Sequence, residues 1–385
     1  MATDATAGGA GGEGAPVVPA TMHGIVYSEY GDASQMKLDT ELPVPEMGED
    51  DVVIATHAAS VNPVDWKIAS GSIKSWPQTL PIVPGWDVAG VIVKAGSKVT
   101  DLKVGDEVYS YIRPAWDMAE EHPESKDEQI SAATGAYAEY CVVKAWKVAK
   151  KPTSLGFVDA AGVPLAGLTA WQGLTGSTNL DIQAGETVLI LGGSGGVGSL
   201  AVQWAKSKGA TVVATCSSAN TKYVSELGAD RVVDYRDAEA VAALAAEGGT
   251  IDKCFDCVGG ETTATGLKSL KEGGKICSIA NWGVGDLAAA EGRGITASSY
   301  LVQPSAEQLT ELAALFDSGA AKAPASRKFA LGDAGAALMA NTLGRTRGKI
   351  VLTTKHLVEE KTNAWVPGAT EIAGIDDDDD FLDFM

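Results

Sequence analysis

The sequence predicts an α/β protein with a doubly wound parallel sheet and a second, β-rich lobe. Two patterns lead to this prediction. From residue 156 to residue 302, short apolar runs alternate with segments of helical periodicity, which is typical of a parallel sheet covered by helices. From residue 22 to residue 155, short strand-like runs are separated by clusters of glycine and proline, which is typical of a partly open β-barrel.

The β-rich lobe comes first along the chain. Its strands are expected in runs that are rich in β-branched or aromatic residues and bounded by turn residues. These runs are Gly24–Tyr27, Asp51–Ala59, Val88–Lys94, Glu107–Tyr111 and Tyr137–Val143. Within this lobe, Arg113–Thr134 is acidic, polar and weakly periodic, so we expect it to form a surface loop or a short lid.

The stretch Gly185–Gly209 predicts a strand, a glycine-rich turn and a helix. Thr187–Leu191 is a buried-strand pattern, and apolar residues then recur on one helical face. With a second strand predicted at Thr211–Cys216, the G-x-G-x-x-G turn has the Rossmann arrangement, in which a pyrophosphate sits at the start of the helix. The alternative is a βαβ unit that binds nothing. The loop residues expected to bind a dinucleotide are Gly193, Ser194, Gly195, Gly196, Val197 and Gly198.

Strands and helices continue to alternate on either side of this unit. Strands are predicted at Arg231–Tyr235, Lys253–Val258 and Lys275–Ala280, and helices at Asp159–Thr175, Lys222–Leu227, Ala238–Ala246, Thr262–Leu270 and Ser305–Phe316. A last strand, Lys349–Thr354, is expected to return to the β-rich lobe, which makes that lobe discontinuous in sequence. The expected division is a tail (1–21), the β-rich domain (22–155), the dinucleotide domain (156–302), the return to the β-rich domain (303–354) and an acidic tail (355–385).

The residues after the second strand of the unit favour NADPH over NADH. Folds that bind NADH usually place an acid there, which bonds the adenosine ribose. This segment has no acid and instead offers Ser217, Ser218 and Lys222, which suit a 2′-phosphate. Tyr235, at the end of the next strand, is expected to flank the adenine or reach the same phosphate. The alternative for Lys222 is an ordinary surface lysine.

Composition excludes several classes of partner. The net charge of −20 argues against nucleic acid and anionic membranes, and no apolar run approaches the ~20 residues of a membrane span. Five scattered cysteines are too few for a disulfide framework and indicate a reducing compartment. Cys254 and Cys257 have C-x-x-C spacing, but they fall in a predicted strand, which favours core positions over a redox or metal pair.

Neither end of the chain is expected to fold. Residues 1–20 are rich in glycine and alanine and lack basic residues, which argues against a cleavable transit peptide. A cytoplasmic location is the expectation, with targeting without cleavage as the alternative. Near the other end, Asp376–Asp380 precedes Phe381–Met385, which predicts either a solvated tail or a peptide that docks on another protein.

Six motifs occur in order between Met22 and Thr354. They are Ala59–Lys67 (ASVNPVDWK), Pro84–Gly90 (PGWDVAG), Val104–Val108 (VGDEV), Gly135–Tyr140 (GAYAEY), Pro164–Ala170 (PLAGLTA) and the glycine loop. With these motifs the chain resembles the medium-chain dehydrogenases/reductases, and within them the zinc-independent quinone and enone oxidoreductases of the ζ-crystallin type. The resemblance implies that the β-rich lobe is a GroES-like catalytic domain. The acidic loop and both tails fall outside the pattern.

The resemblance also implies that metal sites are absent. Zinc-dependent alcohol dehydrogenases of this superfamily hold a catalytic zinc through two cysteines and a histidine. The motifs assign Asn62, Trp86 and Leu165 to those positions, and none of these side chains is a usual zinc ligand. The cysteines of their structural zinc correspond to the cysteine-free Arg113–Thr134. Because oxidation of an unactivated alcohol needs a Lewis acid, reduction of an activated acceptor is expected instead.

By the same resemblance, Asn62 would donate to the substrate carbonyl or the nicotinamide, and Thr169 would line the nicotinamide pocket. Lys67 would bind a developing enolate, bind a cofactor phosphate or face solvent. Groups at the ends of successive strands would hold the nicotinamide carboxamide, namely Val258, Ala280 and Asn281. Four aromatic residues either line a substrate pocket or belong to the core, namely Trp66, Trp76, Trp86 and Tyr111.

We therefore expect NADPH-dependent reduction of quinones or of the C=C bond of α,β-unsaturated carbonyl compounds, with a homodimer as the candidate assembly. One alternative is an enoyl-thioester reductase on the same scaffold. The other is a non-catalytic NADPH-binding sensor or scaffold protein.

Overall fold

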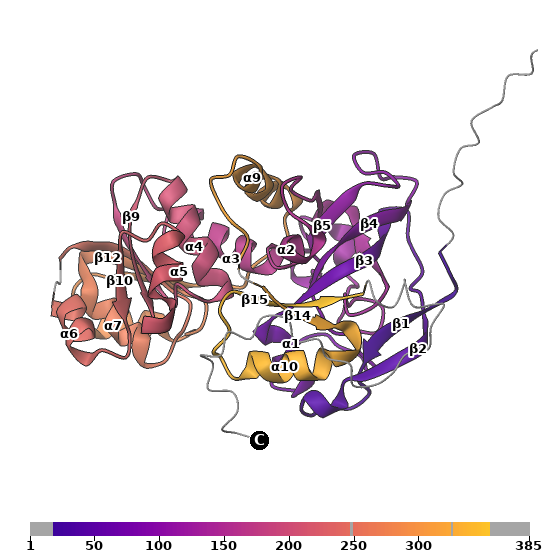
Figure 1. Ribbon diagram of the computed structural model, residues 1–385, viewed down its shortest axis with the longest axis horizontal. Helices are drawn as coiled ribbons and strands as arrows, with labels where there is room; N and C mark the ends of the chain where they lie inside the picture. The colour runs from indigo at the N-terminus through magenta and orange to yellow at the C-terminus, as the bar shows by residue number, and fades with distance from the viewer. Residues whose placement is uncertain (1–17, 247–248, 325, 355–385) are drawn as a thin grey trace, which may run out of the picture.

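The computed structural model describes residues 18–246, 249–324 and 326–354. In this part of the chain two lobes lie side by side, and helix α3 (Pro164–Thr175) and strand β15 (Lys349–Thr353) lie between them (Figure 1). We call them the parallel-sheet lobe, which carries β8–β13 and α4–α8, and the β-rich lobe, which carries β1–β7, β14 and β15. The expected docking peptide and most of the N-terminal tail lie outside the described residues.

The parallel-sheet lobe is built on a six-stranded sheet in the order β10-β9-β8-β11-β12-β13. Every pairing in it is parallel, and the order is that of a dinucleotide-binding Rossmann fold. The strands are β8 (Thr187–Leu191), β9 (Thr211–Cys216), β10 (Arg231–Asp234), β11 (Ile251–Asp256), β12 (Leu270–Ser278) and β13 (Thr296–Ser299). The helices are α4 (Gly196–Ser207), α5 (Thr221–Glu226), α6 (Ala238–Ala246), α7 (Glu261–Ser269) and α8 (Val284–Ala290). The predicted doubly wound sheet is confirmed.

The β-rich lobe is built on a second sheet, in the order β14-β15-β3-β4-β5-β7, with β6 also paired to β3. Its strands are β3 (Asp51–Val61), β4 (Asp87–Ala95), β5 (Glu107–Tyr111), β6 (Tyr140–Lys144), β7 (Val148–Lys150) and β14 (Ser326–Ala330). Strands β1 (Thr21–Val26) and β2 (Lys37–Pro43) form a separate antiparallel pair. The helices around this lobe are α1 (Pro63–Ala69), α2 (Phe157–Ala161), α9 (Ala306–Asp317) and α10 (Ala334–Thr342).

The predicted return of the chain to the β-rich lobe is confirmed, because β15 pairs antiparallel with β3. The sheet path ends at β14 and β7, which makes the lobe open rather than a closed barrel. The single helix predicted at Asp159–Thr175 is wrong, because the structure has two helices there, α2 and α3, separated by Gly162 and Val163. The physical reason is Pro164, which has no N–H to continue a helix and begins a new one at its first position.

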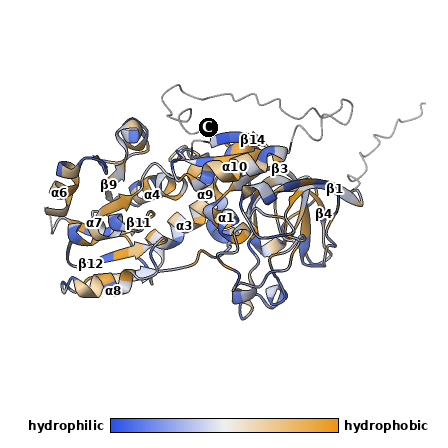
Figure 2. Cartoon of the chain, turned by 90° about the horizontal axis from the view of Figure 1, so that it is seen from below, coloured by the Kyte–Doolittle hydropathy of each residue, from blue (hydrophilic) through white to orange (hydrophobic). Residues whose placement is uncertain are grey.

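The two lobes share one apolar core. Its buried residues include Trp86 and Tyr109 of the β-rich lobe and Val188 and Trp204 of the parallel-sheet lobe. Figure 2 shows apolar residues on the strands of both lobes. The Tyr109 hydroxyl also donates to the Leu309 carbonyl at 2.5 Å, which ties β5 to α9. Among the described helices, none is long and apolar enough to cross a membrane.

The expected surface loop at Arg113–Thr134 is only partly at the surface. It contains two short turns of 3₁₀ helix, Trp116–Met118 and Pro123–Ser125. Arg113, Ser125 and Ile130 are buried, so that part of this segment packs into the lobe. Cys254 is a fully buried residue of β11, as expected, whereas Cys257 follows that strand and is only partly buried.

The glycine turn gives a first testable prediction. A Cβ on Gly198 would lie 2.0 Å from the Gly192 carbonyl oxygen and 2.7 Å from its carbon, and these backbone atoms have no space to move. We expect Gly198→Ala to lower the free energy of unfolding by ~3 kcal/mol, as overpacked cores do. Urea denaturation measures this loss.

A matched control is Gly285→Ala in α8, where an added Cβ meets nothing within 4 Å. Because alanine favours helix more than glycine does, this variant should gain ~0.5–1 kcal/mol. Equal stability of Gly198→Ala and the wild type would contradict the close approach of strand and helix.

Candidate functional site

The glycine loop forms a cradle at the start of α4. Gly192 has φ +82°, and its N–H donates to the Thr215 hydroxyl at 3.0 Å. The Gly193 N–H donates to the Thr215 carbonyl at 2.7 Å, and Gly195 caps the helix. No acidic side chain lies in the first turn of the helix, so nothing there opposes an anion at its N–H groups. This is the geometry that binds a pyrophosphate, and the predicted loop residues are all part of it.

The chain just before and within β15 lies directly on this loop. The Gly348 N–H donates to the Ser194 carbonyl at 2.9 Å, and Gly195 and Gly348 form a parallel bridge. A Cβ on Gly196 would lie 2.7 Å from Cδ of Lys349. The glycine at position 196 is therefore needed where the lysine stem of the β-rich lobe crosses the helix start.

The residues predicted to bind a 2′-phosphate lie together after β9. Ser217 is buried, Ser218 and Lys222 are exposed, and Tyr235 at the end of β10 is 49% exposed. The Lys222 ammonium lies 3.9 Å from the Glu226 carboxylate, its only ion-pair partner among the described residues. The Ser218 N–H donates to the Asp234 carboxylate at 3.1 Å.

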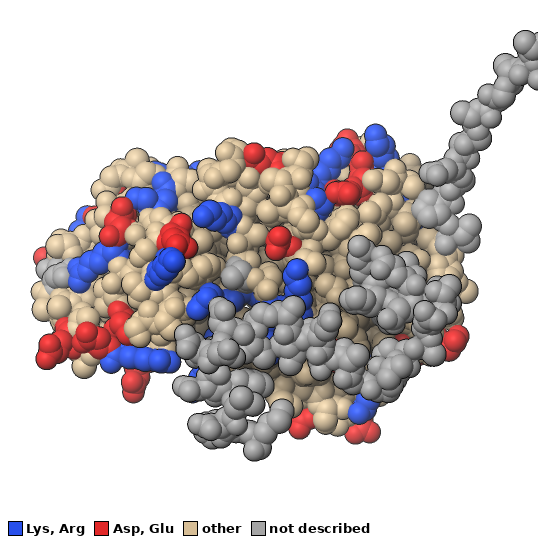
Figure 3. Space-filling model, viewed as in Figure 1, with Lys and Arg blue, Asp and Glu red and all other residues tan. Residues whose placement is uncertain are grey.

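The sequence patterns did not identify one basic residue that lies beside this proposed phosphate site. Arg347 precedes β15, and its Nε donates to the Asn220 amide oxygen at 2.6 Å. Its guanidinium also lies 5.8 Å from the centre of the Tyr223 ring. The available signal was the alternation of basic residues in Arg345, Arg347 and Lys349. Figure 3 shows Lys and Arg side chains on both sides of the boundary between the lobes, over the region of α4, α5 and β15.

The predicted carboxamide-binding residues lie at the ends of β11 and β12, where the buried Asp256 organises both turns. One oxygen of its carboxylate accepts from the N–H groups of Val258 at 3.0 Å and Gly259 at 2.9 Å. The other accepts from the Ser278 hydroxyl at 2.9 Å, whose oxygen in turn accepts from the Asn281 N–H at 2.9 Å. A Cβ on Gly259 would meet Ala280 at 3.0 Å, so the two turns are in contact.

Asn62 lies in a buried polar cluster between the lobes. Its Nδ2 donates to the Asp87 carboxylate at 2.8 Å and to the Ser60 carbonyl at 3.4 Å. Its Oδ1 accepts from the Lys349 ammonium, which also donates to the Val61 carbonyl at 3.1 Å. Both ends of the Asn62 amide therefore have partners within the protein.

Asp87 and Lys349 form a buried ion pair, with Nζ 3.7 Å from Oδ2 and side chains 0% and 5% exposed. Asp87 further accepts from the Ser60 hydroxyl at 2.6 Å and from the Leu165 N–H at 2.7 Å. Burial raises the pKa of Asp87 and lowers that of Lys349, while the pair itself opposes both shifts. Because every neighbour of the carboxylate is a donor, the arrangement suits the ionised form.

Asp65 lies in the same cluster, one helical turn after Asn62. Its carboxylate accepts from the Asn62 N–H and from the Tyr137 hydroxyl, each at 2.8 Å. Its other oxygen is buried and has no hydrogen-bond partner within the described part of the chain. Burial raises the pKa of Asp65 to about 7, and the two donors and Lys349 reduce this effect.

The other two predicted catalytic residues lie outside this cluster. Thr169 is buried on α3, and its hydroxyl donates to the Leu165 carbonyl at 2.7 Å. Its own carbonyl accepts from the Tyr300 hydroxyl. Lys67 is exposed on α1, with its ammonium 5.6 Å from the centre of the Trp66 ring.

The three positions that resemble zinc-ligand positions meet around Asp87. Asn62 and Leu165 bond its carboxylate, and Trp86 precedes it in the chain. Trp86 is buried against Trp76 and Tyr111. Over residues 18–246, 249–324 and 326–354, no group of three or more His, Cys, Asp or Glu side chains could hold a metal ion.

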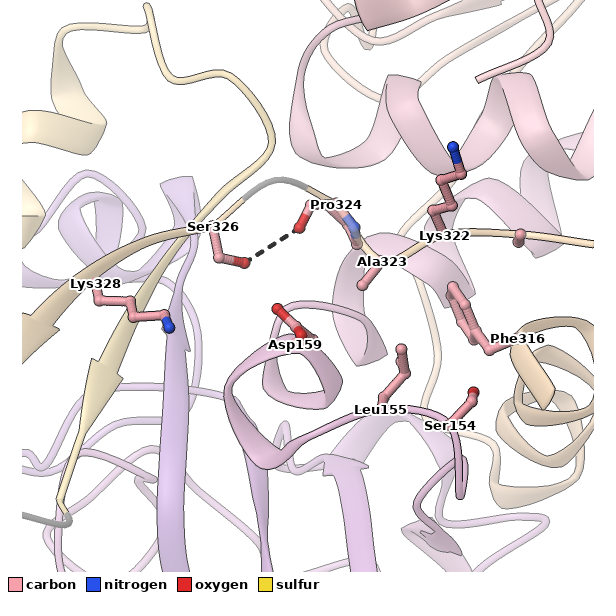
Figure 4. Close-up of a pocket in the computed structure, with 10 residues that line it drawn as sticks. Ser154, Leu155, Asp159, Phe316, Lys322, Ala323, Pro324, Ser326 and Lys328 are labelled. Atoms are coloured by element: carbon pink, nitrogen blue, oxygen red, sulfur yellow. Dashed lines mark hydrogen bonds between the residues drawn. The ribbon is translucent and has the colours of Figure 1, made fainter. Parts of the chain in front are cut away.

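A separate surface pocket lies where α9 leads into β14. Figure 4 shows Lys328 on one side of it, Lys322 and Phe316 on the other, and Asp159 between them. None of the predicted site residues lines this pocket. The candidate site is therefore the boundary between the glycine loop and the Asn62 cluster.

Two protein-family models match the chain. The model described as an alcohol dehydrogenase GroES-like domain matches residues 48–153, and the one described as a zinc-binding dehydrogenase matches residues 227–352. The chain is 32% identical over 340 residues to a chloroplast envelope quinone oxidoreductase homolog of Arabidopsis thaliana, covering 86% of this chain and 98% of that protein. The chain belongs to the quinone/alkenal oxidoreductase family of the medium-chain dehydrogenases/reductases. The predicted resemblance is thereby confirmed.

Two further members support this assignment. An NADPH-dependent alkenal/one oxidoreductase of A. thaliana is 42% identical over 264 residues, which span 68% of this chain but only 63% of that protein. The quinone oxidoreductase of Escherichia coli, solved as a complex with NADPH, has a TM-score of 0.73 and 27% identity, covering 86% of this chain and 99% of its own.

The buried carboxyl of Asp65 gives a second prediction. With a pKa of about 7 against 3.8 for the ordinary group, it holds a proton in the folded state that the unfolded chain has already lost. Between these values, stability therefore falls as pH rises. The Asn in Asp65→Asn stays neutral at every pH. The free energy of unfolding of this variant minus that of the wild type should therefore rise by ~1–3 kcal/mol from about pH 5 to about pH 8.

The control is Asp230→Asn, because hydrogen bonding to the Val212 N–H lowers the pKa of Asp230. The difference in free energy of unfolding between Asp230→Asn and the wild type should stay constant over the same pH range. A constant difference for Asp65→Asn as well would show that this carboxyl is ionised throughout.

Proposed function

We propose that this protein reduces quinones or the C=C bond of α,β-unsaturated carbonyl compounds by hydride transfer from NADPH. The observation that carries the proposal is the contact between the glycine cradle and the Asn62–Asp87–Lys349 cluster, made by Gly348 and Lys349. This contact brings the part of the fold that suits a dinucleotide next to the part that carries the family's catalytic positions. The family relatives that bear quinone and alkenal oxidoreductase names support the same reaction class.

NADPH fits the described residues. The N–H groups at the start of α4 suit its pyrophosphate, and Ser217, Ser218, Lys222 and Arg347 suit its 2′-phosphate. The carboxylate of Asp234 is already occupied by the Ser218 and Arg236 N–H groups. Of the two acids beside these cations, Asp234 is thus bonded to backbone N–H groups, and Glu226 lies 3.9 Å from Lys222. Tyr235 is proposed to flank the adenine.

The nicotinamide end is proposed to lie against the turns held by Asp256. The N–H groups of Val258 and Asn281 are bonded within the protein, which leaves backbone carbonyls and the exposed Val258 and Ala280 side chains to contact the ring. Thr169 is proposed to line the other side. Bound NADPH supplies the hydride.

The side chains at the zinc-ligand positions suit an activated acceptor. Asn62, Trp86 and Leu165 offer an amide, an indole and an alkyl group, none of which holds zinc. A conjugated carbonyl or a quinone accepts hydride without a metal, provided that its oxygen is stabilised and water delivers a proton. We propose that the protein's residues orient the acceptor and that solvent supplies the proton.

Asn62 is proposed to act through its cluster. Both of its Nδ2 hydrogens have acceptors in the protein, so that a bond to a substrate oxygen would replace the long one to Ser60, at 3.4 Å. Its Oδ1 bonds Lys349, whose stem covers the helix start. Loss of the Asn62 amide would therefore disturb both the substrate side and the cofactor side. Lys67, exposed on α1, is proposed to bind an enolate or a cofactor phosphate from the solvent side.

Fewer observations bear on the cellular location and the oligomeric state of the protein. Two relatives carry chloroplast names, so organelle targeting competes with the expected cytoplasmic location. A homodimer is the proposed assembly. A role in docking for the acidic C-terminal residues rests on the sequence alone.

The third prediction concerns cofactor choice. We expect NADPH to bind at least ~tenfold more tightly than NADH, about 1.4 kcal/mol, because Lys222 and Arg347 face the 2′-phosphate. Lys222→Ala and Arg347→Ala should each weaken NADPH and leave NADH unchanged in fluorescence titrations. Lys208→Ala, an exposed lysine after the other end of α4, is the control and should change neither. Equal affinities for both cofactors would contradict the assignment.

The fourth prediction concerns catalysis. NADPH oxidation should be seen with quinones, enones and enals, and Asn62→Ala should lower kcat at least ~tenfold, about 1.4 kcal/mol of barrier. The dissociation constant for NADPH should change far less. Asn341→Ala on α10 controls for loss of an amide elsewhere in the β-rich lobe.

The outcomes separate the alternatives. Wild-type kcat in Asn62→Ala would remove this residue from the mechanism. Turnover of enoyl thioesters alone would favour the thioester reductase, and NADPH binding without turnover of any acceptor would favour the sensor or scaffold.

A further inference from the structure

Arg113 is a buried arginine whose donors are not all used. Its side chain is 0% exposed, and Nη2 donates to the Asp117 carboxylate at 2.8 Å and to the Gln303 amide oxygen. Nε and Nη1 are buried and have no hydrogen-bond partner among the described residues. Because a guanidinium does not lose its proton in proteins, these donors cannot become neutral. Leaving them unpaired costs free energy, which an acceptor brought by a ligand would recover.

The charges around Arg113 are balanced. Lys147 donates to the Arg113 carbonyl at 2.9 Å and to both oxygens of Glu128, at 2.8 and 2.6 Å. Two cations, Arg113 and Lys147, therefore stand beside two acids, Asp117 and Glu128. A carboxylate ligand would add an uncompensated charge to this buried group. A neutral carbonyl oxygen adds none and still accepts from Nε and Nη1.

One aromatic ring lies beside the guanidinium, and two more continue from it. The guanidinium carbon lies 5.4 Å from the centre of the Trp116 ring, and Trp116 packs edge-on against Trp76 at 5.8 Å. Trp76 and Trp86 are nearly parallel, with centroids 6.1 Å apart and an angle of 6°. Such faces favour a flat, conjugated ring as the partner.

This group adjoins the proposed reaction site. Tyr111 of β5 pairs with Asp87 of β4, and the Ile112 N–H donates to the Trp86 carbonyl at 2.7 Å. Arg113 is the next residue, so it lies two positions along the chain from the partner of Asp87. On its other side, Gln303 is bonded twice to Gln172, at 2.8 and 3.0 Å. Gln172 lies on α3, the helix that carries Thr169.

We propose that Arg113 determines specificity by donating to the second carbonyl oxygen of a planar dicarbonyl substrate, of which a para-quinone is the type. The proposal rests on the proposed function and narrows its substrate class. A para-quinone has oxygens at opposite ends of one ring, so one faces the Asn62 cluster while the other meets Arg113. Its reduction takes up a hydride and one proton from water, and both oxygens become hydroxyls. Hydride adds to the ring carbon β to the carbonyl that faces Asn62, and the electron pair of the C=C bond moves to that oxygen, which takes the proton from water. In a quinone the same ring carbon then loses a proton while the distal oxygen gains one. By donating to the distal oxygen, Arg113 orients the ring and withdraws electron density from the C=C bond.

The test compares two acceptors that differ in the second carbonyl only, cyclohexenone and the para-dione cyclohexenedione, with para-benzoquinone as a third. Arg113→Lys keeps the charge and the pairing with Asp117 but removes the planar fork of donors. We expect kcat/KM to fall at least ~tenfold for the dione and the quinone and less than ~threefold for cyclohexenone. Arg293→Lys, in the parallel-sheet lobe, is the control and should not separate the acceptors.

Equal losses for all three acceptors, or no loss, would overturn the proposal while leaving the proposed function intact. Failure of the wild type to reduce any of them would instead overturn the proposed function. If Arg113→Lys does not fold, inhibition of the wild type decides the matter. Saturated cyclohexane-para-dione should then inhibit cyclohexenone reduction at least ~tenfold more strongly than cyclohexanone does, and equal inhibition would refute the proposal.

Discussion

The buried ion pair between Asp87 and Lys349 is the interaction on which the arrangement of the site depends. Two charges removed from water are tolerated only where their remaining hydrogen-bonding groups are also satisfied. Ser60, Asn62 and the Leu165 N–H meet this requirement for Asp87. Satisfying the pair therefore brings together the end of β3 and the starts of β4, α1, α3 and β15.

The same lysine connects this arrangement to the cofactor side. The aliphatic stem of Lys349 crosses Gly196 at the start of α4, while its ammonium reaches Asn62. A single side chain thus spans from the glycine cradle to the β-rich lobe. Since Gly348 also bonds Ser194, the spacing between the two halves of the site is set by two consecutive residues where β15 begins.

The sequence predicted those parts of the molecule that depend on local patterns. The glycine turn is recognisable because its geometry needs residues without a Cβ, as Gly198 against Gly192 shows. The division into lobes follows from the change of periodicity. By contrast, the partners of Asn62 come from positions 25 and 287 residues away, and no local pattern pairs them. Arg113 was missed because a charged residue in a polar stretch is ordinarily at the surface, whereas this one is buried.

The place of β15 in the fold has a consequence for synthesis on the ribosome. Strand β3 begins at Asp51, but its neighbour β15 begins at Lys349, after the whole parallel-sheet lobe has been made. The lobe that emerges first is thus completed last. Until then the last part of β3, Ala58–Val61, has no strand on the edge that faces away from β4, and Asp87 has no lysine. The nascent β-rich lobe therefore waits with an open sheet edge, the kind of surface that chaperones shield from association with other chains.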